Sequence, residues 1–209
     1  MNLNYFLLSL LFGFLFSFCA SGQSALQYDT IANNKLKNKD LKGALDAYNK
    51  GIKADPTYRA LYMGRGEVKA DLGDYKGSIA DFSQCIKIYP DEIAYYQRGI
   101  CYYMLDDYKH ALADFDSTVY YAPDLSYELY FFRGNIKFKL QDLPGSIEEY
   151  TKSIAMKPDY AKAYYNRGVS KYFGDQKQEA CKDISKAIAL GFKDIDPKIK
   201  KYCDYYSAH

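Results

Sequence analysis

Four arginines and four acidic residues recur in this sequence at one spacing, 16 residues apart. The pairs are Arg65 with Asp81, Arg98 with Asp114, Arg133 with Glu149, and Arg167 with Asp183. A guanidinium can donate two parallel hydrogen bonds to a carboxylate, which suits a partly buried contact between two helices. We expect structural ion pairs, because an arginine that recurs with its own counter-ion is already satisfied and does not need a ligand.

The remaining side chains offer little for catalysis. The sequence holds two histidines, His110 and the C-terminal His209, which are too few for a histidine-based metal site or a convincing Ser-His-Asp triad. No glycine-rich phosphate loop follows a predicted strand, and paired acids such as Glu148 and Glu149 fit a helix surface. We therefore expect a protein that is not an enzyme and that uses no metal and no cofactor.

The charge balance disfavours a nucleic-acid partner. The 209 residues include 28 basic and 26 acidic side chains, which leaves a net charge of +2. The two signs alternate along the predicted helices instead of forming the basic stripe that a nucleic acid would need. We expect no nucleic-acid binding.

A repeated unit must position these residues. Pro56, Pro90, Pro123 and Pro158 lie 34, 33 and 35 residues apart, and the sequence between them repeats. Bulky and small residues recur within each copy at spacings of three, four and seven, with a break near the middle, which is typical of two helices and a turn. A fixed period in this range indicates a solenoid. The copies cover residues 25–58, 59–91, 92–126, 127–160 and 161–194.

Each copy carries signals for where its helices begin, approach one another and end. An aspartate precedes the second helix, where its carboxylate can accept free backbone N–H groups. The recurring proline follows that helix and stops it. The eighth position of every copy is small, which lets two helix backbones approach closely. The aspartates are Asp40, Asp74, Asp107 and Asp142, and the small residues are Ala32, Gly66, Gly99, Gly134 and Gly168.

The order of aromatic, small, small and aromatic positions before the proline resembles that of the tetratricopeptide repeat family over residues 25–194. The recurring arginine replaces the usual leucine at position 7, giving Tyr-x-x-Arg-Gly four times. The resemblance implies an all-α fold, a right-handed α-solenoid of five helix-turn-helix repeats within residues 23–194. Because the last repeat needs a cover for its apolar side, we expect a capping helix within residues 195–209, with Asp196 as its cap and Pro197 in its first turn.

The first 22 residues predict a secretory signal peptide. They carry no charged side chain, their apolar run over residues 5–18 is short for a membrane span, and residues 20–22 are small enough for cleavage. A lipid anchor on Cys19 is a second route, which the bulky Phe18 before it disfavours, and an uncleaved anchor is a third. We expect an exported protein, periplasmic, envelope-associated or secreted, with no membrane span after cleavage.

Four cysteines remain in the predicted mature chain: Cys85, Cys101, Cys181 and Cys203. Disulfides are permitted in an exported protein, and four cysteines allow three pairings. Cys181 begins the second helix of the last repeat and Cys203 lies in the predicted capping helix, so a bridge between them would fix that helix. Two reduced thiols in packing positions are the alternative.

The resemblance also implies a binding face. In this family the first helices line the concave side of the array, with positions 2, 5, 9 and 12 facing it. In the third to fifth copies, positions 5 and 12 are aromatic, which suits the side chains of an extended peptide or the rings of a sugar. The first two copies present Asp29, Asn33, Met63 and Glu67 instead, a polar or acidic end. The candidate partner-binding residues are Tyr96, Ile100, Tyr103, Phe131, Asn135, Phe138, Tyr165, Val169 and Tyr172.

These features predict a non-enzymatic interaction scaffold of the bacterial cell envelope, which binds a peptide segment of another protein in a concave aromatic groove. A carbohydrate-binding accessory protein that uses the same groove is the alternative. A third interpretation is that the rings only pack the repeats together or join copies of the chain in self-association.

Overall fold

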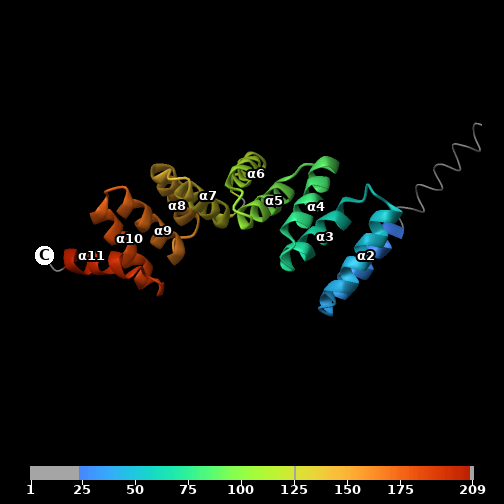
Figure 1. Ribbon diagram of the computed structural model, residues 1–209, viewed down its shortest axis with the longest axis horizontal. Coiled ribbons are helices and arrows are strands. Elements are labelled where there is room, and N and C mark those ends of the chain that lie inside the picture. Colours follow the sequence, from blue (N-terminus) through green and yellow to red (C-terminus); the bar gives the residue numbers. More distant parts are fainter. Residues whose placement is uncertain (1–23, 125, 208–209) are drawn as a thin grey trace, which may run out of the picture. The chain divides into compact units, whose positions relative to one another are not determined.

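The computed structural model describes residues 24–124 and 126–207, and every regular element in these ranges is a helix (Figure 1). This confirms the all-α prediction. The signal peptide predicted over residues 1–22 and the cysteine within it, Cys19, lie outside the described residues. A first helix is described over residues 24–37. The others are α2 (Leu41–Ala54), α3 (Arg59–Asp71), α4 (Tyr75–Ile88), α5 (Glu92–Met104), α6 (Tyr108–Tyr121), α7 (Tyr127–Lys139), α8 (Leu143–Met156), α9 (Ala161–Phe173), α10 (Lys177–Ala189) and α11 (Pro197–Ser207).

The chain divides into two compact units, residues 1–107 and 108–209. In the first unit, α3 packs against α2 and α4, and α4 packs against α5. In the second unit, each helix from α6 to α11 packs against the next one in sequence. The first helices of successive repeats also touch, since α3 contacts α5 and α7 contacts α9. This stacking of antiparallel helix pairs is the predicted solenoid packing within each unit.

The turn between the two helices of a repeat has the same backbone in all five copies. One residue of each turn lies in the left-handed region, and the residue after it precedes the second helix. The carboxylates of Asp40, Asp74 and Asp142 accept the N–H three residues further on at 2.8, 2.9 and 2.9 Å, which confirms these caps. Asp107 directly precedes α6, and its capping stays a prediction. The left-handed residues are Lys39, Gly73, Asp106, Gln141 and Asp175, with φ between 57° and 79°.

The small eighth position makes room for a side chain from the second helix of the same repeat. A Cβ built on Gly134 would lie 2.6 Å from a ring carbon of Tyr150, and one built on Gly66 would lie 2.9 Å from a ring carbon of Phe82. Both rings are 1% exposed. Because glycine has no side chain, a large ring of the second helix can pack directly against its backbone, and the two helices lie close together. This contact contributes to the dense packing of the core.

Three of the four predicted ion pairs are confirmed. Each of these arginines donates two hydrogen bonds to its acid: Arg65 to Asp81 at 2.9 and 2.6 Å, Arg133 to Glu149 at 3.1 Å twice, and Arg167 to Asp183 at 2.8 and 2.7 Å. The acidic side chains are 1–8% exposed. Arg98 and Asp114 belong to different units, and their pairing stays a prediction.

Each buried acid also binds a lysine that the sequence reasoning did not assign. Lys69, Lys137 and Lys171 follow the arginine by one helical turn and lie 2.8 Å from the carboxylates of Asp81, Glu149 and Asp183. One carboxylate thus faces two cations, so the local network carries a net positive charge before other neighbours are counted.

The same arginines bind the preceding repeat through their third nitrogen. Each donates from Nη1 to the residue that follows the bulky residue of the preceding second helix. The acceptors are Asn49 for Arg65 at 2.6 Å, Ser83 for Arg98 at 3.0 Å, Asp116 for Arg133, and Thr151 for Arg167 at 3.1 Å. The guanidinium groups of Arg65, Arg133 and Arg167 each connect three helices, which explains why a planar, five-donor group recurs at this position.

Candidate functional site in the second unit

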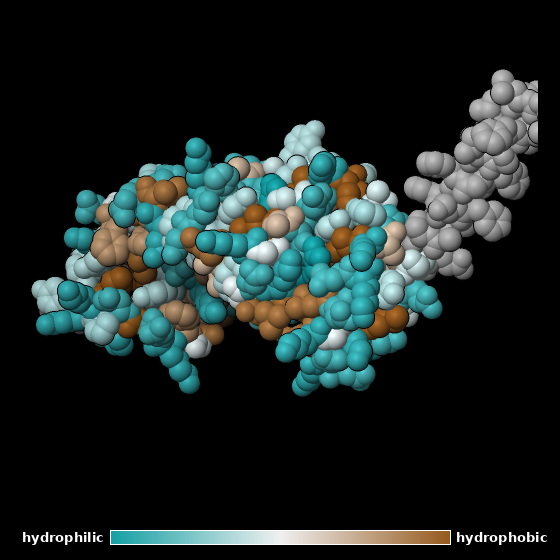
Figure 2. All heavy atoms as spheres, turned by 45° about the vertical axis from the view of Figure 1, so that its right-hand side comes forward, coloured by the Kyte–Doolittle hydropathy of each residue, from teal (hydrophilic) through white to brown (hydrophobic). Residues whose placement is uncertain are grey.

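The exposed apolar side chains do not form one continuous surface on the face drawn in Figure 2. Hydrophobic side chains form separate brown patches among hydrophilic teal ones there. This is what an array of amphipathic helices produces when the apolar stripes face neighbouring helices. A hollow with mixed chemistry is therefore the better candidate site, because small or extended ligands usually bind in such places.

An open hollow of about 550 Å³ lies in the second unit, where α7 and α9 meet the segment between α10 and α11. Aromatic rings share its lining with an ammonium group, a carboxamide and two carboxylates. Its residues are Phe131 from α7, Lys162, Tyr165 and Asn166 from α9, Phe192, Asp194, Ile195 and Asp196 from the segment between α10 and α11, and Pro197, the first residue of α11. The combination can enclose an apolar side chain and also pair with polar groups beside it.

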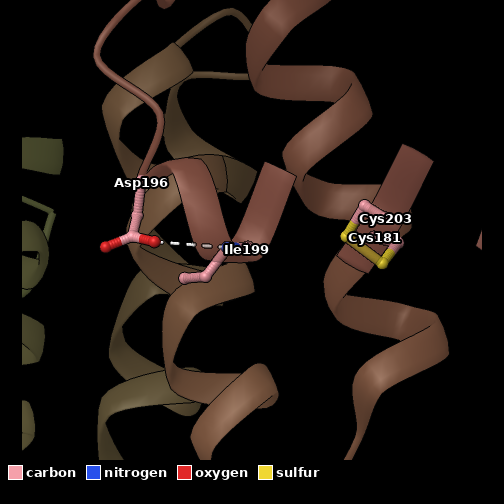
Figure 3. The surroundings of a disulfide bond; sticks show 4 residues. All are labelled: Cys181, Asp196, Ile199 and Cys203. Carbon is pink, nitrogen blue, oxygen red and sulfur yellow. Dashed lines mark hydrogen bonds between the residues drawn. A yellow bond between two sulfur atoms is a disulfide. The ribbon is translucent and has the colours of Figure 1, made fainter. Parts of the chain in front are cut away.

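The segment that closes the hollow is fixed to α9 through Tyr165. The Tyr165 ring stacks on Phe192 with centroids 4.6 Å apart, and its hydroxyl accepts the N–H of Asp196 at 3.2 Å. The Asp196 carboxylate in turn accepts the N–H groups of Lys198 and Ile199 at 2.8 and 3.2 Å, the latter drawn in Figure 3. Asp196 is thus the cap of α11, as predicted.

A disulfide joins Cys181 of α10 to Cys203 of α11, the pair suggested by the sequence (Figure 3). Both cysteines are buried in one cluster with Ile184 and Ile199. The bond closes a loop between residues 22 apart in sequence. Because this loop contains the segment that lines the hollow, the disulfide restricts how far that wall can move.

A hydrogen-bond network orients the carboxamide at the hollow. The Oδ1 atom of Asn135 accepts the Tyr150 hydroxyl and the Nδ2 group of Asn166, each at 2.8 Å. Asn135 belongs to α7, Tyr150 to α8 and Asn166 to α9, so one amide oxygen links three helices. The Asn166 carboxamide is consequently held in one orientation before any ligand arrives.

The structure corrects the expectation that the rings of Phe131, Tyr165 and Tyr172 face an open groove. Phe131 is only 9% exposed, and its ring lies 5.1 Å from that of Tyr160, so it is mainly a core residue whose remaining edge lines the hollow. Tyr165, Val169 and Tyr172 are half-buried and pack against the cluster that includes residues of α11. The reason is that the terminal helix uses them as the apolar surface it covers.

Four other candidate residues do not line the hollow. Phe138 is half-buried and lies near Phe173, with ring centroids 6.2 Å apart. Tyr96, Ile100 and Tyr103 are half-buried on α5 in the first unit. A binding role for these four residues stays a prediction.

Sequence reasoning missed Lys162, Asn166 and the segment 192–197. Lys162 stands at position 2 of the last copy, a position that the family resemblance assigned to the concave side. This position could therefore have identified it as a candidate. Residues 195–197 offered no such signal because they follow the last copy, and at residues 192–194 the last copy departs from the repeat pattern, with Phe192 in place of the recurring proline.

Within residues 24–124 and 126–207, no group of three or more His, Cys, Asp or Glu side chains is placed to hold a metal ion. No helix in that same part of the chain combines the length and apolar character needed to span a membrane.

Two family models match the chain. One described as a tetratricopeptide repeat matches residues 30–93, and one described as a TPR repeat matches residues 134–172. Both matched segments consist of the helix pairs described above, with tyrosine, glycine and the capping aspartate in register. The chain is a tetratricopeptide repeat protein.

Known tetratricopeptide repeat proteins resemble it at modest identity. It is 24% identical over 178 residues to Hsp70-Hsp90 organizing protein 1 of Arabidopsis thaliana, covering 67% of this chain and 31% of that protein. The crystal structure of MamA has a TM-score of 0.77 at 25% identity, over 81% of this chain and 92% of MamA. YrrB, described as a TPR protein with an unusual peptide-binding site, has a TM-score of 0.75 at 21% identity, over 88% and 92%. The chain spans between 26% and 44% of the length of the curated relatives it matches.

Proposed function

We propose that this tetratricopeptide repeat protein is a non-enzymatic interaction scaffold of the cell envelope, which binds a peptide segment of a partner protein in the hollow of its second unit. The observation that carries the proposal is the lining of that hollow. It places Lys162 and Asn166 beside the rings of Phe131 and Tyr165 in an open depression. An extended peptide offers both kinds of group at once, since its backbone is polar and its side chains can be apolar.

The polar groups suit main-chain recognition. Lys162 is exposed and can donate to a peptide carbonyl or carboxylate, while the pre-oriented Asn166 carboxamide belongs to a fixed network. Asp194, also exposed, can accept from a peptide N–H or a basic side chain. The aromatic edges would then contact one side chain of the ligand.

The ring geometry favours a peptide over a sugar. A sugar ring stacks on an open aromatic face, but one face of Tyr165 is covered by Phe192, and Phe131 is almost fully buried. The comparisons add support, since the similarly folded YrrB is described as having a peptide-binding site and the Arabidopsis relative is named as an organizer of Hsp70 and Hsp90.

We also propose that the protein works outside the cytoplasm. The apolar, uncharged stretch over residues 1–22 supports export, and so does the Cys181–Cys203 disulfide, because such bonds persist mainly in oxidising compartments. The intact mass of the mature protein tests this. A chain that begins at Gln23 is expected, whereas a chain that begins at a lipid-modified Cys19, or an uncleaved chain, would contradict cleavage before Gln23.

The peptide function is tested by selecting binders from a random peptide library with the full chain and measuring their affinity by fluorescence anisotropy. Lys162→Glu reverses the exposed charge at the hollow and should weaken the selected peptides about tenfold or more. Lys186→Glu makes the same change at an exposed position of α10 that does not line the hollow, and should leave affinity unchanged. Equal affinity of both variants would contradict the proposed site. Oligosaccharides that bind where no peptide does would favour the carbohydrate function.

A further inference from the structure

Tyr48 and Tyr150 occupy equivalent places in the second helices of the first and fourth repeats, but their hydroxyls differ. The Tyr150 hydroxyl donates to Asn135 at 2.8 Å. The Tyr48 side chain is 1% exposed, yet its hydroxyl makes no hydrogen bond to any residue in the described part of the chain. Phe82 and Phe115 fill the same place in the second and third repeats, so packing does not require the oxygen. A hydroxyl that no protein group binds, on a side chain that is otherwise buried, is available to a ligand.

The Tyr48 oxygen lies beside Gly64 and keeps a small contact with solvent. Among the described residues, Ser153 alone has a fully buried side-chain oxygen or nitrogen without a hydrogen-bond partner. Because the Tyr48 oxygen has no such partner either, it must be in contact with solvent. A Cβ built on Gly64 would lie 2.3 Å from this oxygen. In the last repeat, the place equivalent to Gly64 is filled by Asn166, whose carboxamide closes the corresponding space. Glycine is unfavourable inside a helix, and here it leaves the hydroxyl open.

Two carboxylates act on this oxygen. Burial, followed by the negative charges of Asp29 and Glu67, raises the pKa of Tyr48 to about 12. Glu67 lies on α3, one turn after Gly64, and its side chain remains accessible to solvent. Burial also raises the pKa of both carboxyl groups, and Asp71 contributes to the effect on Glu67. The surroundings of the Tyr48 hydroxyl therefore disfavour negative charge. A bound cation would stabilise the ionised carboxylates.

Nearby lysines are engaged elsewhere. On the first helix, the Lys35 ammonium lies 3.0 Å from Asp40. On α3, the Lys69 ammonium lies 2.8 Å from Asp81. Asn33, the counterpart of the Asn135 that binds Tyr150, donates to Asp29 at 3.5 Å instead. Lys35, Lys69 and Asn33 therefore each have a partner of their own. The two lysines do not neutralise the carboxylates of Asp29 and Glu67.

We propose that Asp29, Glu67 and the hydroxyl of Tyr48 form a subsite for an ammonium group, supplied by a lysine side chain of a bound peptide. An ammonium carries three donors and no acceptor, which matches two carboxylates and one hydroxyl oxygen. The bare backbone at Gly64 lets the end of a lysine side chain reach the oxygen. The subsite lies in the first unit and does not depend on the hollow of the second unit.

The test is an NMR titration of the full, ¹⁵N-labelled chain. The probe is the blocked pentapeptide Gly-Gly-Lys-Gly-Gly, and its matched control carries Nε-acetyl-lysine, which has the same length but no charge. The lysine peptide should shift the amide signals of Gly64 and Glu67 in a saturable way, and the acetylated peptide should not. Glu67→Gln should weaken binding about fivefold, as expected for one partly exposed charge pair.

Two further variants separate the subsite from general charge effects. Tyr48→Phe removes the oxygen while keeping a ring that other repeats tolerate, and it should also weaken binding. Asp46→Asn removes an exposed carboxylate of α2 that pairs with Lys50, and it should have no effect. Far-UV circular dichroism checks that each variant is folded, and Glu67→Gln, at an exposed position, decides the test if Tyr48→Phe does not fold.

The proposal is overturned if the lysine peptide produces no saturable shift at Gly64, if the acetylated peptide shifts it equally, or if Glu67→Gln binds as well as the wild type. Spermidine is titrated as a separate arm. Saturable binding of spermidine without binding of the lysine peptide would overturn the peptide source of the ammonium group.

Discussion

Replacement of Glu149 by glutamine tests whether the recurring ion pairs hold the repeats together. The Glu149 side chain is 1% exposed and accepts two hydrogen bonds from Arg133 at 3.1 Å and one from Lys137 at 2.8 Å. Glutamine removes the buried counter-ion, which leaves Lys137 without a carboxylate and Arg133 with the exposed Asp116 alone; breaking a buried pair typically costs about 3–5 kcal/mol. The amide keeps one acceptor oxygen, so we expect the lower end of that range, about 3 kcal/mol.

The assay is urea unfolding of the full chain, followed by far-UV circular dichroism. With a slope of about 2 kcal/mol per molar urea, a loss of about 3 kcal/mol lowers the midpoint by about 1.5 M. Glu148→Gln is the matched control, since it is the same change at the adjacent residue. Glu148 pairs with Lys152 at 2.7 Å, but both side chains are about half exposed, so its loss should cost less than about 0.5 kcal/mol.

The reasoning would be refuted if the two variants had the same midpoint. A double variant adds a second check. Arg133→Met combined with Glu149→Leu removes both charges of the pair, and it should be more stable than Glu149→Gln alone, because no buried cation is left unpaired. Lys137, with 22% of its side chain exposed, can then turn toward solvent.

Three further outcomes are expected. Reducing the Cys181–Cys203 bond should lower stability by about 3 kcal/mol for a 22-residue loop, seen as a lower melting temperature with dithiothreitol; an unchanged value would mean that α11 stays docked without it. Gly73→Ala should cost about 1 kcal/mol in urea unfolding, because φ is 79° and no atom lies near a new Cβ; equal stability would contradict the backbone argument. Burial raises the pKa of Glu67, so its ionised form opposes folding: the associated stability is present at low pH and is lost as pH rises through the folded pKa. Glu67→Gln should therefore raise the melting temperature at about pH 7 but not at about pH 3, and a gain at both would exclude this cause.

Local signals were sufficient to predict the helices. The cap at Asp74 acts within one turn of α4, and the left-handed turn before it involves a single residue, Gly73. Both effects depend on neighbouring residues in sequence, and the aspartate that recurs in four copies made the caps predictable. The same comparison among copies predicted the contact between Arg65 and Asp81, since the two residue types recur together.

Contacts that are not repeated could not be predicted in this way. The hollow depends on Phe192, which replaces the recurring proline of the other copies, and on residues 194–197, which lie at the end of the last copy and beyond it. Tyr165 was predicted to face a ligand, and it lines the hollow, but one face of its ring stacks on Phe192 because the end of a repeat array must cover its apolar surface. Whether such a ring is exposed or covered depends on which residues pack against it.

The amino-acid sequence by itself determined the helical period, the turns, the caps and the pairing of arginines with acids, because these are set by interactions within one repeat. Only the tertiary structure decided which rings are covered, which amide is oriented at the hollow, and which tyrosine hydroxyl is left unbonded. Tyr48 and Tyr150 show the reason: the residue and its place in the repeat are the same, but the hydroxyl meets Gly64 in one case and an asparagine network in the other. A side chain's chemistry belongs to the sequence, whereas its partners are supplied by neighbouring helices.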